Sequence, residues 1–139
     1  MFQKILLAAD GSEHAIRAAE KAIAIAKHAP DANITIVFVA DPDETKHEVL
    51  ENWNHLDLGA KRKARLQPIE SLIEEADITK EVVMLHGKPG PAIVEYVNRQ
   101  KFDLVVIGSR GLNTLQEFVL GSVSHKVAKR AHCPVLIVK

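Results

Sequence analysis

Short apolar runs alternate along the chain with longer segments of helical period, and this alternation most restricts the possible folds. Runs of strand character are expected at Lys4 to Ala9, Asn33 to Ala40, Glu81 to Leu85, Leu104 to Ile107 and Val135 to Val138. Helices are predicted at about Glu13 to His28, Pro91 to Gln100 and Ser122 to Ala131, with a further helical region before the third strand. Such an order is typical of an α/β fold in which helices cover both faces of a parallel sheet. The continuous apolar character of the first run suits a strand buried on both faces.

The segment between the second and third strands is the hardest to interpret. From Glu44 to Leu58 the charges, two histidines and Trp53 show no clean period, so we expect a mobile or partly helical lid. A helical stripe resumes at Leu66 and continues to Asp77. Pro68 falls inside this stripe, and because its ring clashes with the carbonyl four residues earlier, we expect the helix to start or bend there.

Size and charge exclude several classes of protein. The 139 residues fit one domain, because two cores of half that length would each be marginal. Eighteen basic and eighteen acidic residues give a net charge of zero, which argues against a general nucleic-acid binder. The apolar runs fall short of the roughly 20 residues of a membrane span, and no secretory or transit peptide is expected after Met1. The single Cys133 is typical of a reducing cytoplasm.

Two loops have the character of a ligand site, and both follow strands of the predicted sheet. In an open parallel sheet, ligands bind at the carboxyl ends of the strands, where the winding reverses. The first loop is Ala9-Asp10-Gly11-Ser12, and the second begins at Gly108-Ser109-Arg110-Gly111. Glycines at 108 and 111 allow positive φ and close backbone approach, so successive amides can form an anion site.

A second anion contact is predicted where the last helix begins, at Gly121-Ser122-Val123-Ser124. Unpaired N–H groups and the helix dipole favour negative charge there, and the serines add hydroxyl donors. Each feature alone has an ordinary structural origin: Gly-x-x-Gly occurs in many turns, and a serine before a helix is a common cap. Asp10 fits a turn as well as a ligand contact, and Arg110 fits a solvated loop cation as well as a phosphate contact.

The combination is far more restrictive than its parts. Gly108-x-x-Gly111 is followed after nine residues by Gly121-Ser122, and the pattern joins an apolar strand to a helix. This pattern resembles the ATP-binding branch of the universal stress protein family. The resemblance extends to Ile5-Leu-Leu-Ala-Ala-Asp10-Gly-Ser12, to the turn Gly87-Lys-Pro89 and to His132-Cys-Pro-Val-Leu-Ile-Val138.

The resemblance implies a universal stress protein domain over residues 1–139, with an adenine nucleotide alpha hydrolase-like (Rossmann-like) fold and strand order 3-2-1-4-5. It implies that ribose and phosphates contact Gly108, Gly111, Gly121, Ser122 and Ser124, with Ala9, Val123 and Arg110 in the same two loops. Asp10 would lie beside the ribose or a phosphate-bound Mg²⁺, and Val39 would line the adenine pocket. The family also implies a homodimer made by the last strand.

Function is predicted to be regulatory rather than enzymatic. The P-loop and dinucleotide-binding glycine patterns are absent from the sequence. Phosphoryl transfer needs a base, metal ligands and a cation, and only Asp10 and Arg110 are candidates. We therefore expect ATP binding with at most slow hydrolysis. Bound ATP is expected to order the loop between Leu112 and Leu120 and thereby to alter a surface that faces an unidentified protein partner. A true ATP hydrolase or phosphotransferase, and a nucleotide-independent interaction module, remain as alternatives.

Overall fold

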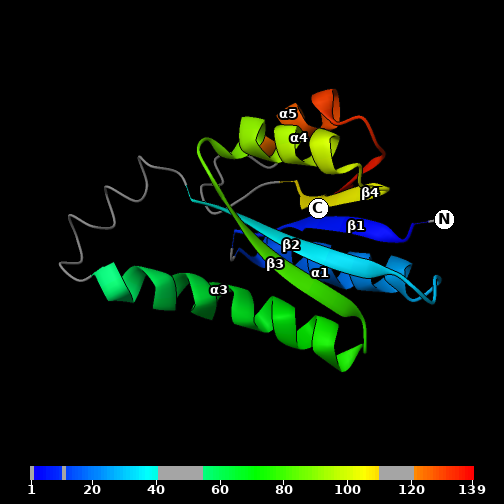
Figure 1. Ribbon diagram of the computed structural model, residues 1–139, viewed down its shortest axis with the longest axis horizontal. Coiled ribbons are helices and arrows are strands. Elements are labelled where there is room, and N and C mark those ends of the chain that lie inside the picture. Colours follow the sequence, from blue (N-terminus) through cyan, green and yellow to red (C-terminus); the bar gives the residue numbers. More distant parts are fainter. Residues whose placement is uncertain (1, 11, 41–54, 110–120) are drawn as a thin grey trace.

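The computed structural model describes residues 2–10, 12–40, 55–109 and 121–139, with the backbone alone for residues 55–62. Strands and helices alternate along these residues, as the sequence predicts (Figure 1). The elements are β1 (Lys4–Ala8), α1 (Glu13–Ala26), β2 (Asn33–Ala40), α3 (His55–Glu75), β3 (Thr79–His86), α4 (Pro89–Gln100), β4 (Leu104–Gly108), α5 (Ser122–Arg130) and β5 (Val135–Val138).

The strands form a five-stranded sheet in the order β3-β2-β1-β4-β5, and every pairing is parallel. This confirms the predicted fold class and strand order. The chain winds outward from β1 in both directions, so the carboxyl ends of β1 and β4 are neighbours. Register pairs Leu7 with Val106, which brings the loops after these two strands to the same edge of the sheet.

Two hydrophobic layers hold the helices against the sheet. Side chains of β1 alternate between them: Ile5 and Leu7 pack with α1 and α3, while Leu6 and Ala8 pack with α4 and α5. Figure 1 shows the two pairs of helices on opposite faces of the sheet. Because Ile5, Leu6 and Leu7 are all fully buried, the central strand has no solvent-facing side. Burial on both faces explains the unbroken apolar run in the sequence.

The helix after β2 corrects one expectation. It begins at His55 rather than near Pro68, inside the segment expected to form a mobile or partly helical lid, and continues through Pro68 to Glu75. Pro68 and Ala64, four residues earlier, are both exposed, so the carbonyl freed by the proline lies on the solvent side. Burial of Leu66, Ile69 and Ile73 against the sheet holds the helix together across that site. Residues 41–54 of the expected lid lie outside the described residues.

Boundaries elsewhere shift by one or two residues. The third strand runs from Thr79 to His86, longer than expected, because it pairs with β2 over its whole length. The next helix begins at Pro89 rather than Pro91, so Pro89 occupies its first position, where a missing N–H costs nothing. Gly87 precedes it with a φ of 122°, a conformation that favours glycine.

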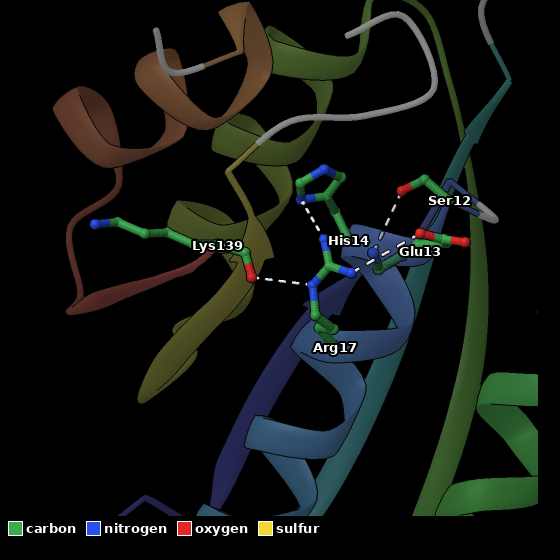
Figure 2. Close-up of polar contacts among 6 residues, drawn as sticks. Ser12, Glu13, His14, Arg17 and Lys139 are labelled. Carbon is green, nitrogen blue, oxygen red and sulfur yellow. Dashed lines mark hydrogen bonds and ion pairs between the residues drawn. The ribbon is translucent and has the colours of Figure 1, made fainter. Parts of the chain in front are cut away.

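The last strand lies at one edge of the sheet and is tied to the first helix by Arg17 (Figure 2). The Nε of Arg17 donates a 3.0 Å hydrogen bond to the backbone carbonyl of Lys139, and a second nitrogen of the same guanidinium lies 3.1 Å from Nδ1 of His14. This arginine therefore joins the first turns of α1 to the end of β5. Among the described residues, no helix is both long enough and apolar enough to cross a membrane.

Candidate functional site

A cavity of about 530 Å³ lies over the carboxyl ends of β1, β2 and β4, within the range of small-molecule sites. Three helices begin at its wall. Residues from the loop before α1, from the start of α4 and from the start of α5 line it. The cavity therefore occupies the position where the winding of the sheet reverses, which is where an open parallel sheet binds ligands.

Eight of the ten residues singled out in the sequence line this one cavity. They come from both predicted loops and from the end of β2: Ala9, Asp10, Val39, Gly108, Gly121, Ser122, Val123 and Ser124. The other two, Arg110 and Gly111, lie outside the described residues. The fold thus brings together segments separated by about 110 positions in the sequence.

The loop after β1 is built by two local hydrogen bonds. Asp10 accepts a 2.9 Å bond at Oδ1 from the backbone N–H of Ser12, and the Ser12 hydroxyl accepts a 3.3 Å bond from the N–H of Ala15. Ser12 is therefore the N-cap of α1, as the capping interpretation predicts. Asp10 both closes this turn and lines the cavity, so its two interpretations are compatible: Oδ1 holds the turn, and a carboxylate has a second oxygen.

Gly108 is not needed for a positive φ, which the sequence suggested as one reason for a glycine at the end of β4. Among the described glycines only Gly87 has a positive φ, so the backbone at Gly108 suits any residue. A glycine is needed at this position because a side chain would have no room. A Cβ on Gly108 would lie 2.7 Å from Cβ of His14 and 3.1 Å from its backbone carbon, closer than side chains pack. Gly108 therefore lets the first turn of α1 approach the sheet beside the cavity.

The start of α5 presents backbone donors to the cavity. Gly121 is the N-cap, with φ −60° and ψ 154°, and no side chain caps the helix. The amide of Gly121 donates a 2.8 Å bond to the carbonyl of Ser109, which fixes the loop end beside β4. Because the first amides of a helix have no intrahelical acceptor, those of Ser122 and Val123 are suited to an anion.

Ser124 differs from the neighbouring serine. It is buried, and its hydroxyl lies 2.8 Å from the carbonyl of Ser109 and 3.0 Å from that of Gly121. A hydroxyl has one proton to donate, so this donor serves the backbone around the cavity. Ser122 is exposed at the cavity wall. In this arrangement, the Ser124 hydroxyl binds the backbone around the cavity, whereas the Ser122 side chain is exposed at the cavity wall.

Three cations at the cavity were not singled out from the sequence as site residues. They come from three different helices or helix ends: Arg65 of α3, Lys88 before α4, and Lys126 of α5. Asp10 is the single acidic residue among the described residues that line the cavity. Three of the four charged residues described at the cavity wall are therefore basic, although the whole chain is neutral. This balance favours an anionic ligand.

The starts of the helices differ in what they offer to an anion. Pro89 and Pro91 line the cavity at the start of α4, and proline has no N–H to donate. Of these two described helix starts, α5 therefore offers more backbone donors than α4. The opposite wall is apolar and includes Val39 and Phe38 at the end of β2, a surface suited to a planar base.

A divalent metal has limited support from protein atoms. The described residues contain no cluster of three or more metal-binding side chains. Mg²⁺ commonly binds through one or two carboxylates together with ligand phosphates and water. The single carboxylate of Asp10 at the cavity wall fits that mode, and it does not fit a metal held by protein atoms alone.

Comparison with curated proteins identifies relatives along the full chain. The sequence profile described as the universal stress protein family matches residues 1–139. A universal stress protein of Methanocaldococcus jannaschii, MJ0531, is 35% identical over 146 aligned positions, covering 100% of this chain and 83% of that protein. A universal stress protein of Thermus aquaticus is 37% identical over 144 aligned positions, which cover 100% of this chain and 100% of that protein.

Solved structures show the same fold. The hypothetical protein MJ0577, also from Methanocaldococcus jannaschii, superposes with a TM-score of 0.87 at 31% identity, covering 100% of this chain and 96% of that one. A universal stress protein in complex with cAMP has a TM-score of 0.73 at 30% identity, and the match covers 99% of this chain and 96% of that one. A family member from Arabidopsis thaliana with AMP bound has a TM-score of 0.70 at 25% identity, and the match covers 99% of this chain and 91% of that one. Sequence profile, relatives and fold agree, and the chain belongs to the universal stress protein family.

Proposed function

We propose that this protein binds an adenine nucleotide, ATP with Mg²⁺, in the cavity at the ends of β1 and β4, and so belongs to the ATP-binding branch of its family. The observation that carries the proposal is the start of α5, where uncapped amides and Ser122 meet a cavity richer in cations than in carboxylates. A helix start of this kind favours phosphate.

The proposed contacts follow the wall of the cavity. The amides of Ser122 and Val123 and the Ser122 hydroxyl bind phosphate, with Arg110 and Gly111 of the glycine motif completing that contact. Val39 borders the adenine, and Asp10 lies at the ribose or at a phosphate-bound Mg²⁺. The magnesium would neutralise phosphate charge, while Asp10 contributes one carboxylate oxygen beside the turn that it closes.

Relatives support the nucleotide class. One structure of similar fold, at 30% identity, is a complex with cAMP, and another, at 25% identity, has AMP bound. Both ligands contain adenosine and a single phosphate. The extra cations of this cavity favour a ligand with more negative charge than either, which is the reason for proposing ATP here.

A regulatory role fits the cavity better than rapid catalysis. Efficient phosphoryl transfer needs a positioned base as well as metal ligands. Asp10 is the single lining carboxylate of the described residues, and one of its oxygens already binds Ser12. We therefore propose at most slow hydrolysis, with nucleotide binding controlling the surface shown to a protein partner.

The proposal extends to assembly and location. Residues 1–139 are proposed to act as one universal stress protein domain in the cytoplasm. The last strand lies at the sheet edge, with Val135, Leu136 and Ile137 half-buried, so a second copy can add its own edge to it. Removal of Val135 to Lys139 is expected to convert the proposed homodimer to monomers, as measured by sedimentation.

Gly121→Val tests the nucleotide site directly. The backbone at Gly121 lies in the extended region, where valine is comfortable, so the fold should survive. The added methyl groups would enter the space in front of the α5 amides. Calorimetric titration with ATP, AMP and cAMP, with and without magnesium, should show binding by the native chain and none by Gly121→Val.

A matched control is Ala128→Val, which adds the same side chain to an exposed position of α5 away from the cavity. Its nucleotide affinity should equal that of the native chain. Equal affinities for all three proteins would refute the assigned pocket. A well-folded native chain that binds none of the three nucleotides would refute the proposed function.

A further inference from the structure

Lys126 occupies a position on α5 from which its side chain returns to the cavity. It follows Ser122 by four residues, so the two lie on the same face of the helix. Side chains of a helix lean toward its N-terminus, which directs the long Lys126 stem back toward the uncapped amides. The residue is half-buried and lines the cavity together with Ser122.

The path of this stem is set by Gly90 in the first turn of α4. A Cβ on Gly90 would lie 2.9 Å from Cδ of Lys126, 3.4 Å from its Cβ and 3.5 Å from its Cγ. The φ of Gly90 is not positive, so its backbone does not require glycine. The missing side chain instead provides the channel in which the lysine crosses from α5 to α4.

The ammonium of Lys126 has a different setting from the cations on the outer surface. Lysine buries its aliphatic stem and keeps its charged end at the polar boundary, which here is the cavity. Within the described residues, neither an ion pair nor a hydrogen bond engages Lys126. An ion pair would hold the charge in place, as Glu70 and Glu74 hold Lys80 elsewhere in the molecule.

We infer that Lys126 contacts the outer phosphates of the ligand and makes the cavity prefer adenosine triphosphate to the monophosphate. This inference rests on the proposed function. The α5 amides, at a fixed place, bind the first phosphate, whereas a lysine on a flexible stem acts as a point charge for the phosphates beyond it. Its attraction grows with each added phosphate charge, so the preference depends on the number of phosphates.

The test compares affinities for ATP, ADP and AMP, measured by calorimetry at one fixed salt concentration. Lys126→Met keeps an apolar stem over Gly90 and removes the charge. Affinity for ATP should fall at least about tenfold, the change expected from losing one charge-assisted hydrogen bond, while affinity for AMP stays within about threefold. Lys129→Met, an exposed change on the same helix, controls for general electrostatics and should leave the ratio of ATP to AMP affinity unchanged.

Gly90→Ala tests the positioning. Its new Cβ should push the lysine stem aside and weaken ATP binding in the native background, but have little effect when combined with Lys126→Met. An equal loss in both backgrounds would mean that Gly90 acts on the ligand directly, and would overturn the positioning claim.

An unchanged ratio of ATP to AMP affinity in Lys126→Met would overturn the role of Lys126 while leaving nucleotide binding intact. Absence of all adenine nucleotide binding in the folded native chain would overturn the proposed function and this inference together. Circular dichroism of each variant confirms that the compared proteins are folded.

Discussion

Gly108→Ala should destabilise the protein through a defined collision between the sheet and the first helix. The new Cβ would lie 2.7 Å from the His14 Cβ, where carbon atoms normally sit about 3.5 to 4.0 Å apart. Two further contacts, at 3.1 Å and 3.2 Å, involve the backbone carbon and oxygen of His14. Rotating the histidine cannot relieve these contacts, so the first turn of α1 has to move.

The expected cost follows from the cost of overpacking a well-packed core, typically about 1 to 3 kcal/mol. An unfolding entropy of about 2.1 cal/mol/K per residue gives about 290 cal/mol/K for this chain of 139 residues. Each kcal/mol then lowers Tm by about 3 °C, so the variant should melt about 3 to 10 °C below the native chain.

Urea unfolding followed by far-UV circular dichroism measures this cost as a lower midpoint with an unchanged m value. Combining Gly108→Ala with His14→Gly removes the shortest of the three contacts, so the two changes should couple favourably in a double-mutant cycle. A loss below about 0.5 kcal/mol for Gly108→Ala would refute the reasoning, because surface substitutions away from such features have effects of that size.

Three further results are expected away from the cavity. Arg17→Met should lower stability by up to about 1 kcal/mol, seen as a reduced urea midpoint, because it removes the tie to Lys139; an unchanged midpoint would mean that this tie contributes nothing. The hydrogen bond to Glu74 raises the pKa of Lys80 above its ordinary 10.5, although burial opposes it. Lys80→Met should therefore cost up to about 1 kcal/mol at pH 8, and the difference from the native chain should disappear as pH rises through the raised pKa; a difference that persists there would contradict an ionic origin. Burial raises the pKa of the Cys133 thiol above its ordinary 9.0, so iodoacetamide should label it slowly at pH 7.5 and faster above pH 9; rapid labelling at pH 7.5 would contradict this.

The fold was predictable because its central strands are buried on both faces. Runs such as Ile5 to Leu7 have to be apolar at every position, and a short unbroken apolar run between helical segments is typical of a strand in a parallel sheet. Strand order came from the family resemblance. The start of α3 was predicted wrongly: Pro68 disfavours a helix locally, and burial of Ile69 and Ile73 outweighs that effect. The apolar stripe around Pro68 is visible in the sequence, but the residues before it show no helical period, so the start of the helix at His55 could not be predicted.

The site was predictable where its residues lie at strand ends. Asp10 lies two residues after β1 and Gly108 is the last residue of β4, so the strands together with their order place both residues at one edge of the sheet. Lys126 and Arg65 reach the cavity from helix faces, and no spacing in the sequence shows which face borders a cavity. Lys88 carried a usable signal, because it lies in the turn before a helix that starts at the same edge of the sheet.

Glycines around the cavity serve different physical needs, and this separation predicts which properties each substitution changes. Gly108 makes room for the backbone of α1, so alanine there should lower stability. Gly121 has ordinary backbone angles and borders the proposed phosphate site, so valine there should remove binding with little loss of stability. Gly90 makes room for a flexible side chain, so alanine there should weaken ATP binding only while Lys126 is present. If the three substitutions instead lowered stability and binding in proportion, a single cause, general loss of structure, would account for them all, and the separate roles assigned to these glycines would be wrong.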